Sequence, residues 1–335
     1  MNITKAEPIY SRLIQPRILY RADGNGQRYY HTIDGDDVRF YPSVTSIIDA
    51  TQPMPFYLKK WIADMGLRQA ERYRDERAAY GTFMHMMIGE LLMNGTLDLD
   101  GMADRIADYC TDNGYDYDWT LWTAELKKDL VAFNHFATEY NIKPIAIEMM
   151  LASDTHGFAG AIDLVCMMTV QVKGFWGETY KTGDRKGQPK ETKQAQDVVA
   201  IVDFKSGRHS FNDSNDLQAN MYMMLWNENF PETPVERCYN WSPKDWQKVD
   251  EDSVPYHLKD QTSDLSKSEV PHMVALFGYR ERHKPKDVLS ITGSLTIGAT
   301  NGLVVSRKAI EDVVKEWHNK KEQLMSGCDR EDLQC

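Results

Sequence analysis

The chain has 335 residues, 42% hydrophobic and 27% charged, as in ordinary soluble globular proteins. No apolar run approaches the ~20 residues that span a bilayer, and residues 1–8 lack the apolar segment of an export signal. We therefore expect a cytoplasmic protein with no membrane partner. The five cysteines are scattered and contain no CxxC pair, so neither a disulfide framework nor a cysteine metal site is indicated.

The net charge is −11, from 39 basic and 50 acidic residues. Binding to phosphates needs local positive potential, so this overall sign opposes a nucleic-acid partner. An enzyme can still carry a basic stripe on an acidic body. The composition therefore disfavours a pure DNA-binding module more than it disfavours a metal-dependent enzyme.

The chain begins with a predicted β-rich element at residues 1–42. Strands are expected at 18–21, 27–31 and 38–41, and Asp23-Gly24-Asn25-Gly26 is a strong hairpin turn signal between the first two. Hydroxyl side chains from Ser43 onward can cap a helix, and a mostly helical region should follow. It runs to about residue 140 and includes a Met-rich apolar helix at 81–93 and an amphipathic helix at 120–140.

Strand-like sequence begins after residue 144. The three predicted strands cover residues 145–151, 161–166 and 198–205, and the Gly- and Lys-rich stretch at 173–196 is expected to be an extended hairpin loop or insertion. A helix at 216–228, a strand at 235–241, a turn at 240–246 without assigned chemistry, and a helix at 306–325 before a frayed tail at 326–335 complete the prediction. We expect an α/β core at 43–240, with its upstream helices, and an accessory region at 241–335.

Three of these strand regions carry an acidic residue among apolar neighbours: Glu148, Asp163 and Asp203. Burying a carboxylate in such a strand costs on the order of several kcal/mol unless the carboxylate is paired or binds a cation. If the second and third strands pair in antiparallel fashion, Asp163 and Asp203 can meet on one face. Lys205 lies two residues beyond Asp203 and therefore shares its face. Oxygen ligands of this kind suit Mg²⁺ or Mn²⁺.

An ordered series of motifs surrounds these residues. It consists of Gly81-Thr82-Phe83-Met84-His85, then Glu148, Gly157-Phe158-Ala159-Gly160-Ala161-Ile162-Asp163, Ile201-Val202-Asp203-Phe204-Lys205-Ser206-Gly207, and Gln218-Ala219-Asn220-Met221-Tyr222. This series resembles the PD-(D/E)XK nuclease superfamily, and within it the branch of RecB-like exonucleases. The resemblance covers about half of the chain, from Ser43 to Trp226. Each motif alone is weak, and the specificity lies in their order.

The resemblance implies a restriction-endonuclease-like fold, in which a small mixed sheet is flanked by helices, here with an N-terminal β-hairpin element and added helices. It implies that Asp163, Asp203 and the carbonyl of Phe204 bind metal and that Lys205 is catalytic. His85 and Glu148 would complete the metal site, and Gln218 and Tyr222 would contact DNA. One or two Mg²⁺ or Mn²⁺ ions are expected. The cysteines that hold an iron–sulfur cluster in some relatives are absent, so no cluster is expected, and the long 173–196 insertion is expected to hold DNA or a partner.

Each assignment has a structural alternative. Asp163, Asp203 and Lys205 could form an ion pair at a strand end, His85 could be a core histidine, and Glu148 could be a salt-bridge partner. Gln218 and Tyr222 could be ordinary helix-surface residues. The basic residues at 68–77 and 279–286 could bind phosphate, or they could be solvated and salt-bridged. Glu90 lies five residues after His85, off its helical face, and is left out of the site.

The expected activity is metal-dependent hydrolysis of DNA, single- or double-stranded, by an exonuclease of bacterial or phage recombination, repair or replication. A protein partner from that process is a further expectation. The alternatives are a structure-specific or restriction-type endonuclease, a non-catalytic DNA-binding or assembly subunit, and a hydrolase of small phosphoesters. The intact Asp163, Asp203 and Lys205 disfavour the non-catalytic subunit.

Overall fold

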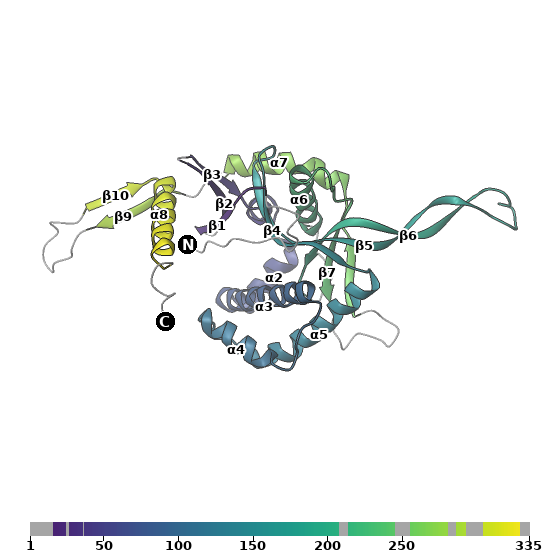
Figure 1. Cartoon of the computed structure of the whole chain (residues 1–335), viewed down its shortest axis with the longest axis horizontal. Helices are drawn as coiled ribbons and strands as arrows, with labels where there is room; N and C mark the ends of the chain where they lie inside the picture. The colour runs from purple at the N-terminus through teal and green to yellow at the C-terminus, as the bar shows by residue number, and fades with distance from the viewer. Residues whose placement is uncertain are drawn as a thin grey trace.

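A five-stranded mixed sheet forms the centre of the protein, with helices on its flanks (Figure 1). The computed structural model describes residues 16–24, 27–35, 37–207, 214–244, 255–280, 286–292 and 304–328. The sheet order is β4 (Lys143–Ser153), β5 (Phe158–Thr179), β6 (Pro189–Phe204), β7 (Arg237–Pro243) and β8 (Tyr256–Asp260). β6 and β7 are parallel, and the other neighbours are antiparallel. The three predicted acidic strands are thus confirmed as neighbours.

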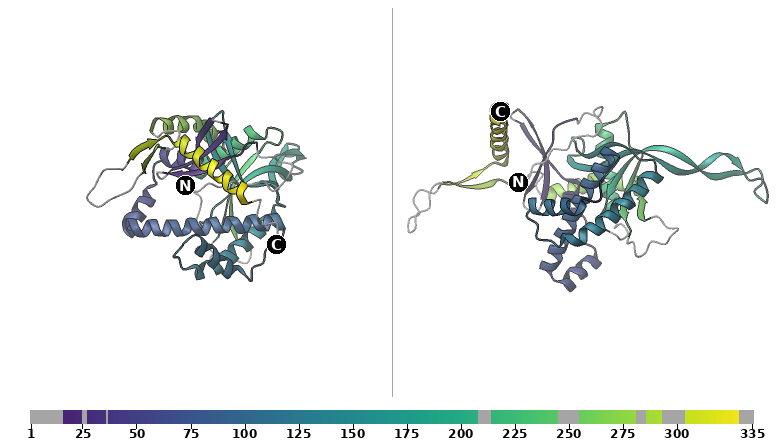
Figure 2. Two further views of the ribbon diagram at one scale, coloured as in Figure 1. Left: turned by 60° about the vertical axis from the view of Figure 1, so that its left-hand side comes forward. Right: turned by 60° about the horizontal axis from the view of Figure 1, so that its bottom comes forward.

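Helices cover both faces of this sheet (Figure 2). One face packs on α3 (Leu67–Asn94), α4 (Met102–Asp112) and α5 (Trp119–Glu139) through a cluster that includes Phe83, Phe133 and Trp241. The other packs on α1 (Val44–Thr51), α6 (Ser214–Asn229) and α7 (Asp264–Arg280). The helix α2 (Phe56–Met65) precedes α3. No helix among the described residues combines the length and apolar character that a bilayer crossing requires.

The N-terminal strands form a separate antiparallel sheet that packs against one end of the central sheet. They are β1 (Tyr20–Gly24), β2 (Gln27–Asp34) and β3 (Asp37–Pro42), as the sequence predicts. Gly24 pairs with Gln27 across the predicted hairpin, whose residues 25 and 26 lie outside the described residues. Leu19, Tyr30 and Tyr41 bury their side chains against β4 and β5. The Ser43 hydroxyl then accepts the amide hydrogen bond of Ser46 and caps α1, as expected.

The 173–196 stretch continues β5 and β6 as a two-stranded antiparallel ribbon, paired from Lys173↔Lys193 to Thr179↔Pro189. It extends well beyond the rest of the sheet (Figure 1). The expected loop is therefore β structure over most of its length, with an irregular register between Phe175 and Thr179.

The region after residue 240 differs in detail from its prediction. Residues 240–243 were expected to turn, but they belong to β7: residues 240 and 241 pair with both β6 and β8, and residues 242 and 243 pair with β8. The last helix was expected from Ser306, but Ser306 pairs with Ser290 in a hairpin of β9 (Val288–Thr292) and β10 (Val304–Lys308). The helix α8 (Ile310–Cys328) begins later, with two acidic residues in its first turn that favour a start there. Its end includes residues 326–328 of the predicted frayed tail, and the remainder of that tail lies outside the described residues.

The helix α8 contacts the N-terminal sheet through a buried histidine. His31 has no solvent exposure, and its ring stacks on Tyr20 at 5.6 Å and meets His318 of α8 edge-on at 5.8 Å. Neither ring nitrogen of His31 has a hydrogen-bond partner among the described residues. Burial, and then the nearby His318, lower the pKa of His31 to about 4.

Because this pKa is lowered in the folded state, its stabilising effect is present above pH 6.5 and is lost as the pH falls toward 4. We predict that acidification from pH 7 to pH 5 costs about 2 kcal/mol of unfolding free energy through this residue. His31→Phe should keep the packing and reduce the acid sensitivity, as measured by urea unfolding at the two pH values. The exposed His272, changed to Gln, serves as the control, and an equal acid response in all three proteins would contradict the assignment.

Candidate functional site

Four polar side chains occupy one row across the sheet. Leu164 pairs with Val202, which places Asp163 of β5 opposite Asp203 of β6. Asp203 pairs in turn with Asn240 of β7. The pairs on either side of Glu148 in β4 place it opposite Asp163. Strand pairing alone therefore assembles Glu148, Asp163 and Asp203, as the sequence predicts, and adds Asn240.

The regular alternation of the strands is interrupted at this row. Glu148 has a φ of 50°, a left-handed conformation that costs on the order of 1–3 kcal/mol for a residue with a side chain. Ile147 and Met149 are two residues apart, yet they belong to the clusters on opposite faces of the sheet. Ile162 and Val165 are three residues apart, yet both lie in the cluster beneath α6. This change of face lets side chains from both layers of helices approach the same carboxylates.

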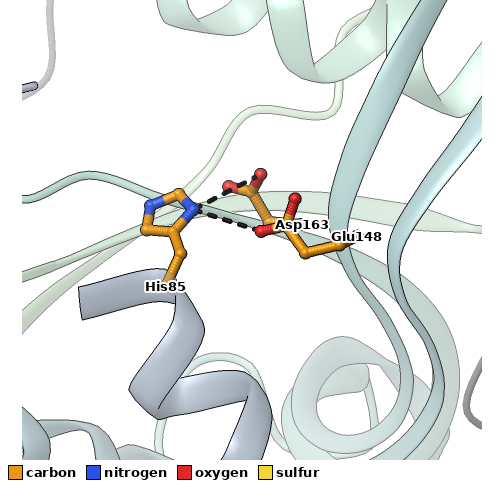
Figure 3. A group of neighbouring side chains, drawn as sticks. All are labelled: His85, Glu148 and Asp163. Atoms are coloured by element: carbon orange, nitrogen blue, oxygen red, sulfur yellow. Dashed lines mark ion pairs between the residues drawn. The ribbon is translucent and has the colours of Figure 1, made fainter. Parts of the chain in front are cut away.

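His85 approaches the row from α3. Its Nδ1 lies 3.4 Å from Glu148 Oε1 and 3.7 Å from Asp163 Oδ1 (Figure 3). One ligand atom from each of these three residues falls within 4.8 Å of the others, a spacing that suits a single metal ion. The imidazole also packs edge-on against the ring of Phe204 at 5.5 Å. His85 is thus placed at the predicted site, and its nitrogen faces the carboxylates.

Asp163 is oriented by the backbone of the next strand. The amide of Phe204 donates a hydrogen bond of 2.7 Å to Asp163 Oδ2, while Oδ1 faces His85. Two carboxylates and an imidazole are a ligand set that Mn²⁺ accepts readily, and the carboxylates also suit Mg²⁺. The donor set therefore fits a divalent cation. The predicted metal ligation by the Phe204 carbonyl stays a prediction.

Asp203 is held differently from Asp163. Its side chain is buried, and its Oδ2 lies 2.7 Å from Lys205 Nζ and accepts a hydrogen bond of 2.6 Å from Asn240 Nδ2. Asn240 is fixed by Gln261, whose Nε2 donates to Asn240 Oδ1 at 2.7 Å. Asp203 is not part of the His85–Glu148–Asp163 group, and its Oδ2 is engaged by Lys205 and Asn240. The predicted metal ligation by Asp203 stays a prediction. The sequence assigned Asn240 to a turn and gave it no chemistry, whereas the structure places it in β7 with its side chain on Asp203.

The helix α6 brings Gln218 and Tyr222 to the same place. Lys205 Nζ donates to Gln218 Oε1 at 2.6 Å, and Gln218 Nε2 donates to the Tyr222 hydroxyl at 3.0 Å. Tyr222 is only 6% exposed, so the alternative of an ordinary surface residue is wrong for it. A Cβ atom at Gly160 would lie 2.7 Å from Tyr222 Cε1, which explains why the motif has glycine there. A chain of contacts thus links Asp203 to Tyr222 through Lys205 and Gln218.

Burial and closely spaced carboxylates shift the pKa values of Asp163 and His85. Burial raises the pKa of Asp163, and the like charges of Asp203 and Glu148 raise it further against the opposing effect of His85. Burial alone would lower the pKa of His85, but the surrounding carboxylates, led by Asp163, outweigh it and raise the pKa to about 9. The group therefore retains protons that a divalent cation would displace.

A cavity of about 510 Å³ joins these residues to the N-terminal sheet. Arg21 and Arg28 line it, and the two guanidinium groups share Asp23 at 2.8 and 3.3 Å. The sequence reasoning missed both arginines, because nothing local shows that β1 and β2 lie beside β4 and β5. The alternation of side chains along β1 and β2 indicates which residues share a face of the strand. It does not identify the element that this face packs against. The other lining residues include all of the predicted site: His85, Glu148, Asp163, Asp203, Phe204, Lys205, Gln218 and Tyr222.

The remaining basic candidates lie elsewhere. Arg77 pairs with Glu125 at 2.9 Å, and Arg72 and Arg74 pair with Asp116 and Asp75, so the salt-bridged interpretation of this helix holds for these three. Glu90 pairs with Arg105, away from the site, as expected. In the 279–286 segment Tyr279 is highly exposed, and residues 281–285 lie outside the described residues.

Comparison with models of protein families finds none that matches this chain, and a search of curated proteins finds no similar sequence.

The contact between Asn240 and Asp203 yields a first prediction for the site. Asn240→Leu has a similar volume, but it removes one of the two partners of Asp203 Oδ2, which keeps Lys205, and it leaves Gln261 Nε2 without its buried acceptor. We expect a loss of about 2–4 kcal/mol in unfolding free energy and roughly 10–100-fold weaker Mn²⁺ binding, measured by urea unfolding and titration calorimetry. The exposed Asn134→Leu is the matched control, and unchanged Mn²⁺ affinity in Asn240→Leu would contradict a positioning role.

The raised pKa of His85 yields a second prediction. Its stabilising effect in the metal-free protein is present below pH 6.5 and is lost as the pH rises through about 9. The melting temperature in EDTA should therefore fall over this range, whereas Mn²⁺ affinity should rise, because binding displaces the proton. His85→Gln should flatten both profiles. Identical profiles in the variant and the parent protein would show that His85 is not the titrating group.

Proposed function

We propose that this protein is a metal-dependent deoxyribonuclease whose active site is the row Glu148, Asp163 and Asp203 with Lys205. The observation that carries the proposal is the gathering of three carboxylates, an imidazole and a lysine around one cavity. Glu148, Asp163 and His85 would hold Mg²⁺ or Mn²⁺, and Asp203 lies beside them. When bound, such an ion lowers the pKa of a water molecule and polarises a phosphate.

The residues of this chain have distinct parts in the proposed reaction. Lys205 Nζ has three N–H groups, of which two are used on Asp203 and Gln218, so one remains for a phosphate oxygen or the attacking water. Its charge would stabilise the negative charge that develops on the attacked phosphate. Water is the nucleophile in this proposal, and no covalent intermediate with the enzyme forms.

The two arginines of the N-terminal sheet support a phosphodiester substrate. Arg21 and Arg28 line the cavity opposite an acidic cluster, and a guanidinium group binds phosphate oxygens well. Carboxylates for a cation and guanidinium groups for an anion thus face one cavity. Gln218 and Tyr222 would contact DNA beside this site. Among deoxyribonucleases, the motif order favours an exonuclease, and the endonuclease remains an outcome of the test.

The test uses end-labelled linear DNA and closed-circular DNA with Mg²⁺, Mn²⁺ or EDTA. We expect degradation of linear DNA only, its loss in EDTA, and a fall of roughly 100–1,000-fold in rate for Lys205→Ala because a charge on the reacting phosphate is lost. Lys128→Ala, an exposed lysine on α5, is the matched control. Cutting of the circle would indicate an endonuclease, and absence of metal-dependent cleavage of either DNA would refute the catalytic proposal.

A further inference from the structure

The ribbon formed by residues 173–196, here called the arm, carries a net positive charge in this acidic protein. It contains six basic residues against three acidic ones, in a chain whose net charge is −11. Within the described part of the chain, none of the six forms an ion pair. Their charge is therefore available to an external anion. The basic residues are Lys173, Lys181, Arg185, Lys186, Lys190 and Lys193.

The positions of two of these lysines destabilise the arm. Lys173 and Lys193 are directly paired across the two strands, so their side chains lie on the same face. Like charges in this position destabilise a strand pair. Glu191, paired with Phe175, lies on the same face, but within the described residues it forms no ion pair with either lysine. A two-stranded ribbon is only marginally stable by itself, so the lysine pair is still unfavourable for the arm. A bound phosphate would offset the repulsion.

An aromatic side chain continues the same face. Phe175 is two residues beyond Lys173, so it shares the face of the lysine pair, and it is 70% exposed. A phenyl ring beside two lysines suits a nucleic-acid strand, because the charges bind phosphates while the ring packs on a sugar or a base.

The rest of the arm is held together internally. Trp176 Nε1 donates to the carbonyl of Thr192 at 3.2 Å on the other face. At the tip the guanidinium of Arg185 lies 5.3 Å from the ring centroid of Tyr180, and Gly187 donates to the Tyr180 carbonyl at 2.9 Å. These contacts keep the ribbon formed while they leave the face of Lys173, Lys193 and Phe175 uncovered.

The arm is continuous with the strand that carries Asp163. Ten residues of β5 separate Asp163 from Lys173, which corresponds to roughly 33 Å of extended strand. That span matches about ten nucleotides of a duplex strand. We propose, on the basis of the proposed function, that the arm binds the DNA backbone about ten nucleotides from the cleavage site, through Lys173, Lys193 and Phe175.

The experiment measures DNA binding by fluorescence anisotropy in EDTA, where no cleavage occurs, with a duplex of about 40 base pairs. Lys173→Gln/Lys193→Gln should weaken binding roughly tenfold and reduce the slope of log affinity against log salt by about 2. Lys127→Gln/Lys128→Gln, on α5, is the matched control and should bind as the parent does. Lys193→Glu places a carboxylate opposite Lys173 and changes the charge as much as the double glutamine variant does, so it should raise the melting temperature while it weakens binding to a similar extent. That combination separates DNA binding from a structural role.

Cleavage in Mg²⁺ locates the contact relative to the site. The double glutamine variant should raise KM for the long duplex about tenfold and leave kcat/KM unchanged for a hairpin-closed duplex of about 8 base pairs, which cannot reach the arm from the site. Unchanged binding and salt slope in this variant would overturn the arm proposal, even if DNA is cleaved, and would leave a protein partner as the better occupant. Conversely, DNA binding that depends on the arm without any cleavage would refute the proposed nuclease activity and support the proposed role of the arm in DNA binding.

Discussion

The mutual repulsion of three carboxylates at the centre of a sheet is the constraint on which the site depends. Each of these carboxylates contacts a specific donor or cationic group. Asp163 accepts a hydrogen bond from the Phe204 amide. Asp203 forms an ion pair with Lys205 and accepts a hydrogen bond from Asn240. Glu148 faces the imidazole of His85. Glu148 reaches its position only through a left-handed backbone conformation. Backbone strain and closely spaced carboxylates at one place are features that proteins retain where a bound ligand compensates their cost.

The positive charges that face this row come from elements far apart in the sequence. His85 belongs to α3, Lys205 follows β6, and the two arginines lie on β1 and β2. The N-terminal sheet can supply its arginines only because Leu19, Tyr30 and Tyr41 are buried against β4 and β5. Its apolar packing therefore has a functional consequence, since it closes one side of the cavity with cationic groups.

The sequence was sufficient for the part of the site that local pairing creates. β5 and β6 form a hairpin, so the meeting of Asp163 and Asp203 follows from antiparallel pairing alone. Asn240 was missed because β7 pairs in parallel with β6 after the crossover helix α6, and the register of such a pair is not encoded locally. The arginines depend on packing between two sheets. The start of α8 was misplaced because β10 is a short, exposed strand that ends directly before the helix.

The charge distribution is compatible with the proposed binding of DNA by an acidic protein. Because the arm is net positive, the rest of the chain is more acidic than the whole, and a DNA strand would be repelled over most of the surface. Cationic groups face the cavity, from Arg21, Arg28 and Lys205, and they also line the arm. The arm and the carboxylate row are joined through β5, so in the proposed function a DNA strand held at both places would be aligned along this strand. The acidic remainder of the chain would then disfavour other placements of the DNA.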